Sequence, residues 1–396
     1  MPGSMLPEKH FPLQNLELER TDFYTFEGDK SKPLLLFGLR GPGGMNCLWP
    51  VVELLRNEGY PTDLLIDSAA KRILETKNRQ FTKQPAESPL KRIMETKPAV
   101  AVSEFSADAG TALTVTWSEE SYGVPVVWVE DYPDVLGSYT DLYDSSMRIN
   151  PDYLCVMSDA TRDLAMKRRP TMDSSRIIVT GHPDYDKYAN IDKEEVRNET
   201  RKKLGVSNGE FLIVYSGLLP PQTPEVLERL VENLNKSEIS KNLVLLLSRH
   251  PRDMCPEQEY DKVLANFKGR VMKQGDISSD DIGFACDLLV APGPSTEVLK
   301  SAYRRVPSMF IFTEADAAQL TNDQLPITLR VGASEGVFDY QDLKTSLEKI
   351  VNDNNFRVHL VEKMKQYFNS DGNSALRIAA VIKKAAESQT KAHEYR

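Results

Sequence analysis

A glycine-rich stretch, FGLRGPGG at 37–44, is the first place in the chain where the residue types suggest chemistry. It follows the apolar run PLLL and precedes a helical pattern, so it joins a strand to a helix. A P-loop needs Lys directly after its last glycine, and the third glycine of a dinucleotide fingerprint would fall on Asn46, so neither motif fits. What remains is a bare loop before a helix N-terminus, whose unpaired N–H groups can face a ligand. We expect Gly43 and Gly44 to lie against a ligand; the alternative is a tight turn without one.

Carboxylates stand at the ends of two predicted strands in the same half of the chain. Glu104 lies in AVAVSEF, and Glu130 and Asp131 follow the apolar run VPVVWV. Removing a proton from a hydroxyl group requires a general base, and a positioned carboxylate can serve as one. Two acids directly after a buried strand are unfavourable unless they are used or paired, so we expect Glu130 and Asp131 to be catalytic, with Glu104 as a further candidate. The alternative is a solvated strand end.

Small and polar residues in the second half, APGPST at 291–296, join another predicted strand to a helix without bulky side chains. Ser295 and Thr296 can cap this helix and offer hydroxyl groups, and the N–H groups of its first turn suit the charge of a nucleotide diphosphate. We therefore expect Gly293 and Pro294, together with the two hydroxyl residues, to bind a nucleotide diphosphate.

Two other predicted strand ends could serve the same anion. Gly217, in YSGLLPPQT, allows close approach of the backbone, and Arg249 and His250, in SRHP, follow the next strand, where a cation can pair with phosphate oxygens. The alternatives are that Arg249 is a surface ion-pair partner and that His250 is an ordinary loop residue. No DxD motif stands at a strand end, so we expect no metal ion.

Composition excludes several classes of protein. The chain has 396 residues and a net charge of −9, without a strong Lys/Arg cluster, which argues against nucleic-acid binding. Its four cysteines are widely spaced and form no CxxC pair, so we expect neither structural zinc nor disulfides, in keeping with a reducing cytoplasm. The longest apolar runs are strand-sized, and we expect no transmembrane segment or signal peptide.

The elements that position these residues follow one alternating pattern, which occurs twice. Short aliphatic runs alternate with helical patterns from Leu34 onward, which is typical of parallel strands buried on both faces and hence of a doubly wound α/β sheet. The pattern restarts after a polar, helix-prone bridge near 192–208. We predict a first Rossmann-like domain at 1–195, a second at 205–368, and a C-terminal helix at 369–396 that packs back toward the first domain. Thr223 is the expected N-cap of the first helix in the second domain.

In this order the motifs resemble the GT-B fold of glycosyltransferases and non-hydrolysing UDP-N-acetylglucosamine 2-epimerases, over about 33–384. The resembling segments are GLRGPGGMNCLWPVVELLRNEGY, YLCVMSDATRDLAMK with RIIVTGHPDYDKY, SRHP, and DLLVAPGPSTEVLKSAYRRVPSMFIF. The resemblance implies two doubly wound domains that face each other across a cleft. It also implies a Glu that holds the ribose of the donor, but the matching place is Lys300, and Glu297, one helical turn away, is the candidate substitute.

The resemblance implies a metal-independent glycosyltransferase with a nucleotide-diphosphate sugar, UDP-linked by preference, as donor substrate and no other cofactor; the acceptor is open, and a homodimer is one option. A first alternative is an epimerase, although of its acidic signatures only Glu130 matches. A second is a polyol-phosphate transferase, which also carries an HP motif after a donor-domain strand, and a third is a catalytically silent binding protein.

Overall fold

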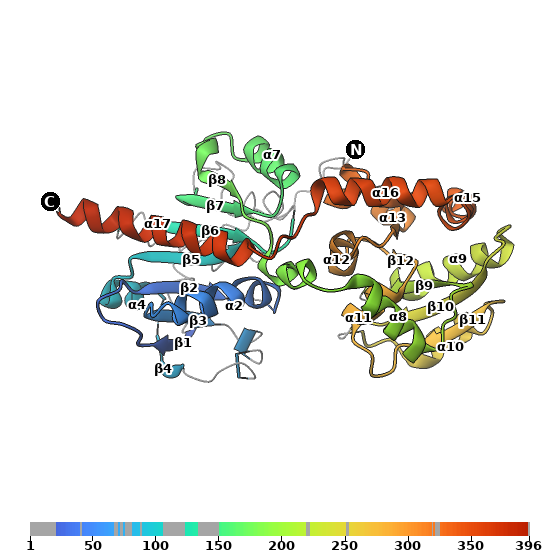
Figure 1. Ribbon diagram of the computed structural model, residues 1–396, viewed down its shortest axis with the longest axis horizontal. Coiled ribbons are helices and arrows are strands. Elements are labelled where there is room, and N and C mark those ends of the chain that lie inside the picture. Colours follow the sequence, from blue (N-terminus) through green and yellow to red (C-terminus); the bar gives the residue numbers. More distant parts are fainter. Residues whose placement is uncertain are drawn as a thin grey trace, which may run out of the picture. The chain divides into compact units, whose positions relative to one another are not determined.

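The computed structural model describes residues 21–39, 42–66, 70–71, 74–75, 81–87, 89–105, 123–133, 150–218, 222–250, 253–318, 320 and 325–394 (Figure 1). The chain forms two compact units. The first comprises Met1–Lys187 together with Ser370–Arg396, and the second comprises Tyr188–Asn369.

The first unit contains one mixed sheet with helices on both faces. Its strands are β1 (Thr21–Phe26), β2 (Leu35–Leu39), β3 (Thr62–Ile66), β4 (Thr82–Glu87), β5 (Val100–Phe105), β6 (Val126–Glu130), β7 (Tyr153–Val156) and β8 (Ile177–Val179). Its α-helices are α2 (Pro42–Asn57), α4 (Pro89–Thr96), α7 (Asp159–Arg168) and α17 (Ser374–Glu394), and its 3₁₀ turns are η2 (Ser174–Arg176) and the start of η3 (Pro183–Ala189).

The strand order of this sheet, among the described residues, is β4-β1-β3-β2-β5-β6-β7-β8. The strands from β3 to β8 in this order are parallel, whereas β1 is antiparallel to both of its neighbours. Successive residues of a strand face opposite sides, so each apolar strand supplies two cores.

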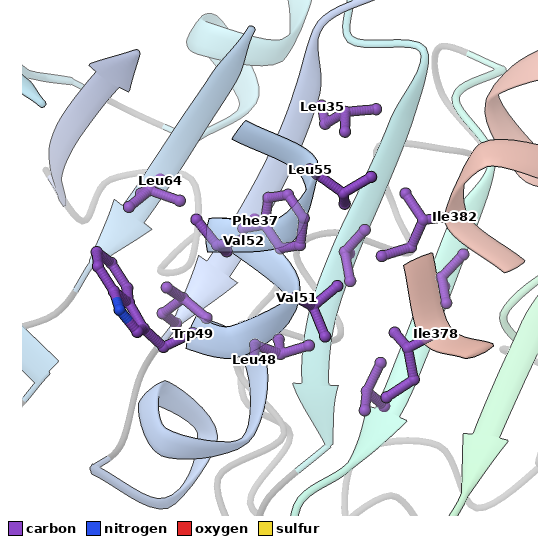
Figure 2. Close-up of a cluster of buried hydrophobic side chains, with 14 of the residues drawn as sticks. Leu35, Phe37, Leu48, Trp49, Val51, Val52, Leu55, Leu64, Ile378 and Ile382 are labelled. Carbon is purple, nitrogen blue, oxygen red and sulfur yellow. The ribbon is translucent and has the colours of Figure 1, made fainter. Parts of the chain in front are cut away.

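One core of the first unit lies under α2 and α17. Phe37 of β2 packs there with Val51 and Leu55 of α2 and with Ile378 and Ile382 of α17 (Figure 2). The second core lies on the other face of the sheet and includes residues of α4 and α7. The last helix of the chain thus completes the core of the first unit.

The second unit repeats this design with a parallel sheet, which has six strands among the described residues. Its strands are β9 (Glu210–Ser216), β10 (Asn242–Ser248), β11 (Arg270–Lys273), β12 (Leu288–Ala291), β13 (Ser308–Ile311) and β14 (Glu335–Val337). Its helices are α8 (Lys193–Leu204), α9 (Gln222–Lys236), α10 (Glu257–Leu264), α11 (Ser279–Ala285), α12 (Thr296–Arg304), α13 (Glu314–Ala317), α14 (Ile327–Arg330), α15 (Tyr340–Asn352) and α16 (Asn354–Tyr367).

The order β11-β10-β9-β12-β13-β14 is that of a dinucleotide-binding Rossmann sheet, because the chain moves outward from β9 and then returns to its other side at β12. One face of this sheet packs against α8, α11 and α12 through apolar side chains such as Leu204, Ile282 and Val298. The predicted α/β class with two doubly wound sheets is therefore confirmed.

Several elements differ from the sequence-based expectation. Strands β1 and β4 interrupt the predicted alternation, and the polar bridge near 192–208 contains α8, which belongs to the second unit. Two of its arginines, Arg197 and Arg201, both pair with Asp287, at 2.6 and 3.0 Å, which fixes the helix to that unit. The sequence pattern also predicts a helix over 109–122, a range that lies outside the described residues.

Candidate functional site

The sheet of the first unit has a topological switch point between β2 and β5. From β2 the chain passes to β3 on one side, and from β5 it proceeds to β6 on the other. In open α/β sheets, ligands bind outside the carboxyl ends of the strands at such a point. The start of α2, after β2, and Glu104, near the end of β5, both lie there.

The two glycines at the start of α2 lie against carboxylates of the protein itself. A Cβ atom on Gly44 would collide with the side chain of Glu104, whose Oε1 would be 2.7 Å away. A Cβ atom on Gly43 would lie 2.9 Å from Oδ2 of Asp131. One reason for glycine at these two positions is therefore that the missing side chains make room for two acids. The acids lie near the N-terminus of a helix, where negative charge is stabilised.

Asp131 has the electrostatic properties of a proton acceptor that works near neutral pH. Burial raises the pKa of its carboxyl group to about 7, although the backbone N–H groups of Asp131 and Tyr132 act in the opposite direction. The residue as a whole is half-buried, but Oδ1 is out of solvent and has no hydrogen-bond partner among the described residues. A carboxylate with a pKa near the working pH is suited to general base catalysis.

Glu130, which the sequence pairs with Asp131, has a different environment. Its side chain is buried, and Oε2 accepts a hydrogen bond of 3.0 Å from the N–H of Met157, just after β7. Its carbonyl oxygen faces Sγ of Cys47 at 3.9 Å. The structure therefore ties Glu130 into the contact between β6 and β7, while Asp131 lies against Gly43.

A histidine that sequence reasoning did not select supports the segment of Asp131. His182, after β8, is buried, and its Nε2 lies 3.0 Å from the carbonyl oxygen of Asp131. The N–H of Asp184 donates to Nδ1 at 3.2 Å, so the proton of the neutral ring is on Nε2 and is donated to Asp131. Burial lowers the pKa of His182 to about 4, and the ring stacks on Tyr185 with centroids 4.2 Å apart. The sequence signal that could have identified His182 is its place in the TGHP turn, which follows a strand.

The second sheet has its switch point between β9 and β12, and two of the predicted loops flank it. Gly217 follows β9, and a Cβ atom on it would lie 2.8 Å from Cγ2 of Thr223. Gly293 follows β12 with φ 129°, a conformation that favours glycine, and its Cβ position is 3.5 Å from Cδ1 of Leu218. The loops that contain Gly217 and Gly293 are thus in contact at the switch point.

Thr223 is not the N-cap that the sequence suggests, because α9 begins one residue earlier, at Gln222. Its hydroxyl group instead accepts from the N–H of Leu218 at 2.9 Å and donates to the carbonyl oxygen of Leu218 at 2.8 Å. The buried phenol of Tyr215 donates to the carbonyl oxygen of Thr223 at 2.8 Å. These bonds fix the loop after β9.

Ser295 is the N-cap of α12. Its Oγ accepts the N–H of Glu297 at 3.2 Å, whereas Pro294 and Thr296, on either side, are exposed. Ser295 is thus a cap, as expected, whereas Thr296 is the first residue of the helix and not a second cap.

The structure gives Glu297 partners within the protein. Its carboxylate lies 2.8 Å from Nζ of Lys300 and 3.1 Å from Nη1 of Arg304. Arg304 is buried and also pairs with Asp280 and with the hydroxyl group of Tyr188. Lys300 and Glu297 thus form one ion pair, and Arg304 connects it to the start of the second unit.

Arg249 pairs with residues of the loop that follows it. Its Nε pairs with Asp253 at 3.0 Å, and Nη2 donates to the carbonyl oxygen of Cys255 at 2.5 Å. The guanidinium also lies over the ring of Tyr260, 4.8 Å from its centroid. The alternative, that Arg249 is a surface ion-pair partner, therefore accounts for much of its contact with the protein. His250 follows it in a half-buried position.

Within the described ranges no group of three or more His, Cys, Asp or Glu side chains is arranged to hold a metal ion. In the same part of the chain no helix is long and apolar enough to cross a membrane.

Comparisons with known proteins agree with this architecture. Residues 140–291 match the family model of CDP-glycerol:poly(glycerophosphate) glycerophosphotransferases, which is less than half of the chain. A search of curated protein sequences gave no match.

Solved structures of similar fold cover almost the whole chain. The UDP-N-acetylglucosamine 2-epimerase of Neisseria meningitidis, bound to UDP-N-acetylglucosamine, is 11% identical and has a TM-score of 0.62, covering 89% of this chain and 100% of the other. MurG of Acinetobacter baumannii is 13% identical with a TM-score of 0.61, covering 89% and 99%. The wall teichoic acid polymerase TagF is 12% identical with a TM-score of 0.52, covering 91% and 90%. At these identities the likeness establishes the fold, which is the predicted one of GT-B glycosyltransferases and 2-epimerases.

Proposed function

We propose that the chain is a transferase that moves a group from a nucleotide-diphosphate donor to a hydroxyl acceptor without a metal ion, and that the group is a sugar. The donor-side residues are in the second unit: Gly217, Gly293, Pro294, Ser295 and Thr296, with Arg249 and His250 at the neighbouring strand end. The acceptor-side residues are in the first unit, around Gly43 and Gly44.

The observation that carries this proposal is the contact between the loops after β9 and β12. These loops flank the switch point of a sheet with Rossmann order, and Gly293 has φ 129°, a backbone conformation that favours glycine. The capped start of α12 adds N–H groups that stabilise negative charge. This arrangement suits the leaving diphosphate, whose charge grows as the transferred group departs.

The catalytic base in this proposal is Asp131, with Glu130 and His182 as positioning residues. Ionised Asp131 takes the proton of the acceptor hydroxyl while the oxygen of that hydroxyl attacks the donor. His182 holds the carbonyl oxygen of Asp131, and Glu130 holds the backbone of Met157. Glu297, paired with Lys300 and Arg304, reaches a ribose hydroxyl only if that hydroxyl joins or replaces these partners.

A second candidate function is transfer of glycerol phosphate from CDP-glycerol. The family match at 140–291 favours it, and this range contains His182, Gly217, Arg249 and His250. The same base would serve, because a hydroxyl attacks in both reactions. In this one the hydroxyl attacks the phosphorus next to glycerol, the bond between the two phosphates breaks, and CMP leaves, so the diphosphate site would hold both phosphates of the donor before transfer. An epimerase, suggested by the neighbour from Neisseria meningitidis, would need no acceptor.

Titration calorimetry with UDP, CDP and the matching nucleosides tests the donor site. We expect a diphosphate to bind at least tenfold more tightly than its nucleoside, and Ser295→Ala together with Gly293→Val to weaken the diphosphate selectively. Turnover of UDP-sugars and of CDP-glycerol, each with and without acceptors, then separates the three reactions. Absence of binding by every nucleoside diphosphate would reject the proposed function.

A further inference from the structure

A polar groove of about 640 Å³ lies in the second unit, away from the proposed donor loops. Its floor contains the amino ends of three strands, at Glu210 of β9, Asp287 before β12 and Pro307 before β13. The donor loops follow the carboxyl ends of β9 and β12, so the groove lies at the opposite edge of the same parallel sheet. Its volume is in the usual range for a small-molecule site.

Two helices form the walls of this groove, and each contributes one row of side chains. Lys193, Glu194 and Arg197 of α8 line one side. Residues spaced by one helical turn, including Arg357, Val361 and Lys365 of α16, line the other. The groove is therefore a defined surface of helices and strand ends, not a gap between loops.

Positive charge exceeds negative charge in the groove, on a chain whose net charge is −9. Seven lining residues are basic and four are acidic. Three of the acids are already paired: Asp287 with Arg197, Glu210 with Arg270, and Glu362 with Lys365. Arg304 is also paired, with Glu297 and Asp280. The lining cations without an ion pair among the described residues are therefore Lys193, Lys241, Arg305 and Arg357.

Lys193 and Arg305 are the two cations on which this excess of positive charge is centred. Nζ of Lys193 donates to the carbonyl oxygen of Tyr303 at 2.9 Å, and Arg305 donates to the carbonyl oxygen of Met364 at 2.7 Å and to Oδ1 of Asn369 at 3.0 Å. All these acceptors are neutral, and neither cation has a carboxylate within ion-pair distance among the described residues. Arg357, further along α16, likewise donates to carbonyl oxygens, at 2.7 Å for that of Ile350.

The backbone conformation of Arg305 is also unusual. It has φ 68°, in the left-handed region, at the C-cap of α12, where glycine is the residue with the least strain. An arginine at this place carries a conformational penalty, of about 1 kcal/mol, that glycine would not. Burial lowers the pKa of Lys193 to about 8, and the charge of Arg305 acts in the same direction, as expected for two cations that share a site. Burial also lowers the pKa of Arg305, against the opposite effect of Glu362.

We propose that this groove binds a small phosphorylated ligand, with its phosphate between Lys193 and Arg305. The caps of the two wall helices, Asp192 and Asp353, already accept the N–H groups of the first turns, so the ligand is held by side chains and not by helix ends. A phosphate dianion would replace the mutual repulsion of Lys193 and Arg305 with two charge-assisted hydrogen bonds. This site is independent of the proposed transferase chemistry.

Acylation of lysines at pH 7, read residue by residue by mass spectrometry with inorganic pyrophosphate as the probe, locates the site. We expect saturating pyrophosphate to slow the modification of Lys193 at least fivefold and to leave that of Lys202, exposed on the same helix, unchanged. Lys193→Gln should weaken pyrophosphate binding about tenfold or more, as expected for the loss of a charge-assisted hydrogen bond. The matched control Lys202→Gln removes the same charge and should stay within about twofold of the wild type.

Ser295→Ala separates this groove from the donor site, because it alters the start of α12 and should leave the protection of Lys193 intact. The proposal is overturned if Lys193 is not protected at a pyrophosphate concentration that saturates the protein. It is also overturned if Lys193→Gln and Lys202→Gln weaken binding equally, or if pyrophosphate does not bind at all.

Discussion

Glu130 and Asp131 are adjacent acids whose side chains have different partners. Glu130 accepts a backbone N–H and thereby belongs to the sheet, whereas Asp131 lies beside the start of α2 with a pKa raised to about 7. At the scale of single residues, the environment and not the residue type therefore selects the candidate base. Sequence alone could place both acids at a strand end, but it could not show which carboxylate finds a partner across the sheet.

We predict that Asp131→Asn lowers turnover by about 10²- to 10⁴-fold, because the amide cannot accept the proton of the acceptor. Wild-type turnover should fall as the pH drops below about 7, where Asp131 becomes protonated. Glu130→Gln keeps an oxygen for the N–H of Met157 and should stay within about tenfold of the wild type. Similar losses in both variants would contradict the assignment of the base to Asp131.

The same substitution has a consequence for stability. The pKa of Asp131 is raised from 3.8 to about 7 on folding, so its favourable contribution is complete below pH 3.8 and is lost as the pH rises to about 7. The loss is on the order of 4 kcal/mol, at about 1.4 kcal/mol per pKa unit. Urea unfolding at several pH values should show a flatter profile for Asp131→Asn between these limits, and an unchanged slope would count against the burial of this carboxylate.

At the scale of elements, the start of α2 shows how a loop and two neighbouring strands act together. We predict different results for two glycine substitutions one residue apart. A Cβ atom on Gly44 meets the middle of the buried Glu104 side chain, so Gly44→Ala should destabilise the protein by about 1–3 kcal/mol. A Cβ atom on Gly43 meets only the end of Asp131, and helix propensity favours alanine by about 1 kcal/mol. Gly43→Ala should therefore fold normally but lose at least tenfold in turnover.

Urea unfolding and turnover of the two variants give the comparison. Equal stability with full turnover for Gly43→Ala would mean that the displaced carboxylate has no part in the reaction. A large loss of stability for Gly43→Ala would mean that the glycine serves only the turn.

The elements that could be predicted from sequence are those with a local signature. Buried parallel strands are continuous apolar runs, and strand-to-helix loops are marked by glycine and proline, so these strands and loops could be predicted. The strand order that creates the two switch points could not, because it depends on pairing between distant strands. Strand β4, TKQPAE, has no such run and forms because β1 pairs with it. His182, the ion pairs of Glu297 and the loop bonds of Thr223 also depend on partners remote in the chain or on the fold of a loop, which local patterns do not encode.

At the scale of the whole molecule, the first unit is built from both ends of the chain. We predict that Ile382→Ala in α17 destabilises the protein by about 2–5 kcal/mol, because Ile382 is fully buried in a core with residues of α2 and β2 (Figure 2). Leu376, on the same helix, is 52% exposed, and Leu376→Ala should change the free energy of unfolding by less than about 0.5 kcal/mol. Equal effects in urea unfolding would mean that α17 is not an integral part of this core.

The discontinuous first unit also affects the order in which the protein can fold during synthesis. Chains emerge from the ribosome N-terminus first, and domains generally fold as units. The second unit, 188–369, is one uninterrupted stretch, but the core of the first unit lacks Ile378 and Ile382 until the segment after the second unit has been made. The strands of the first unit are therefore translated before the second unit but acquire their full core only after it.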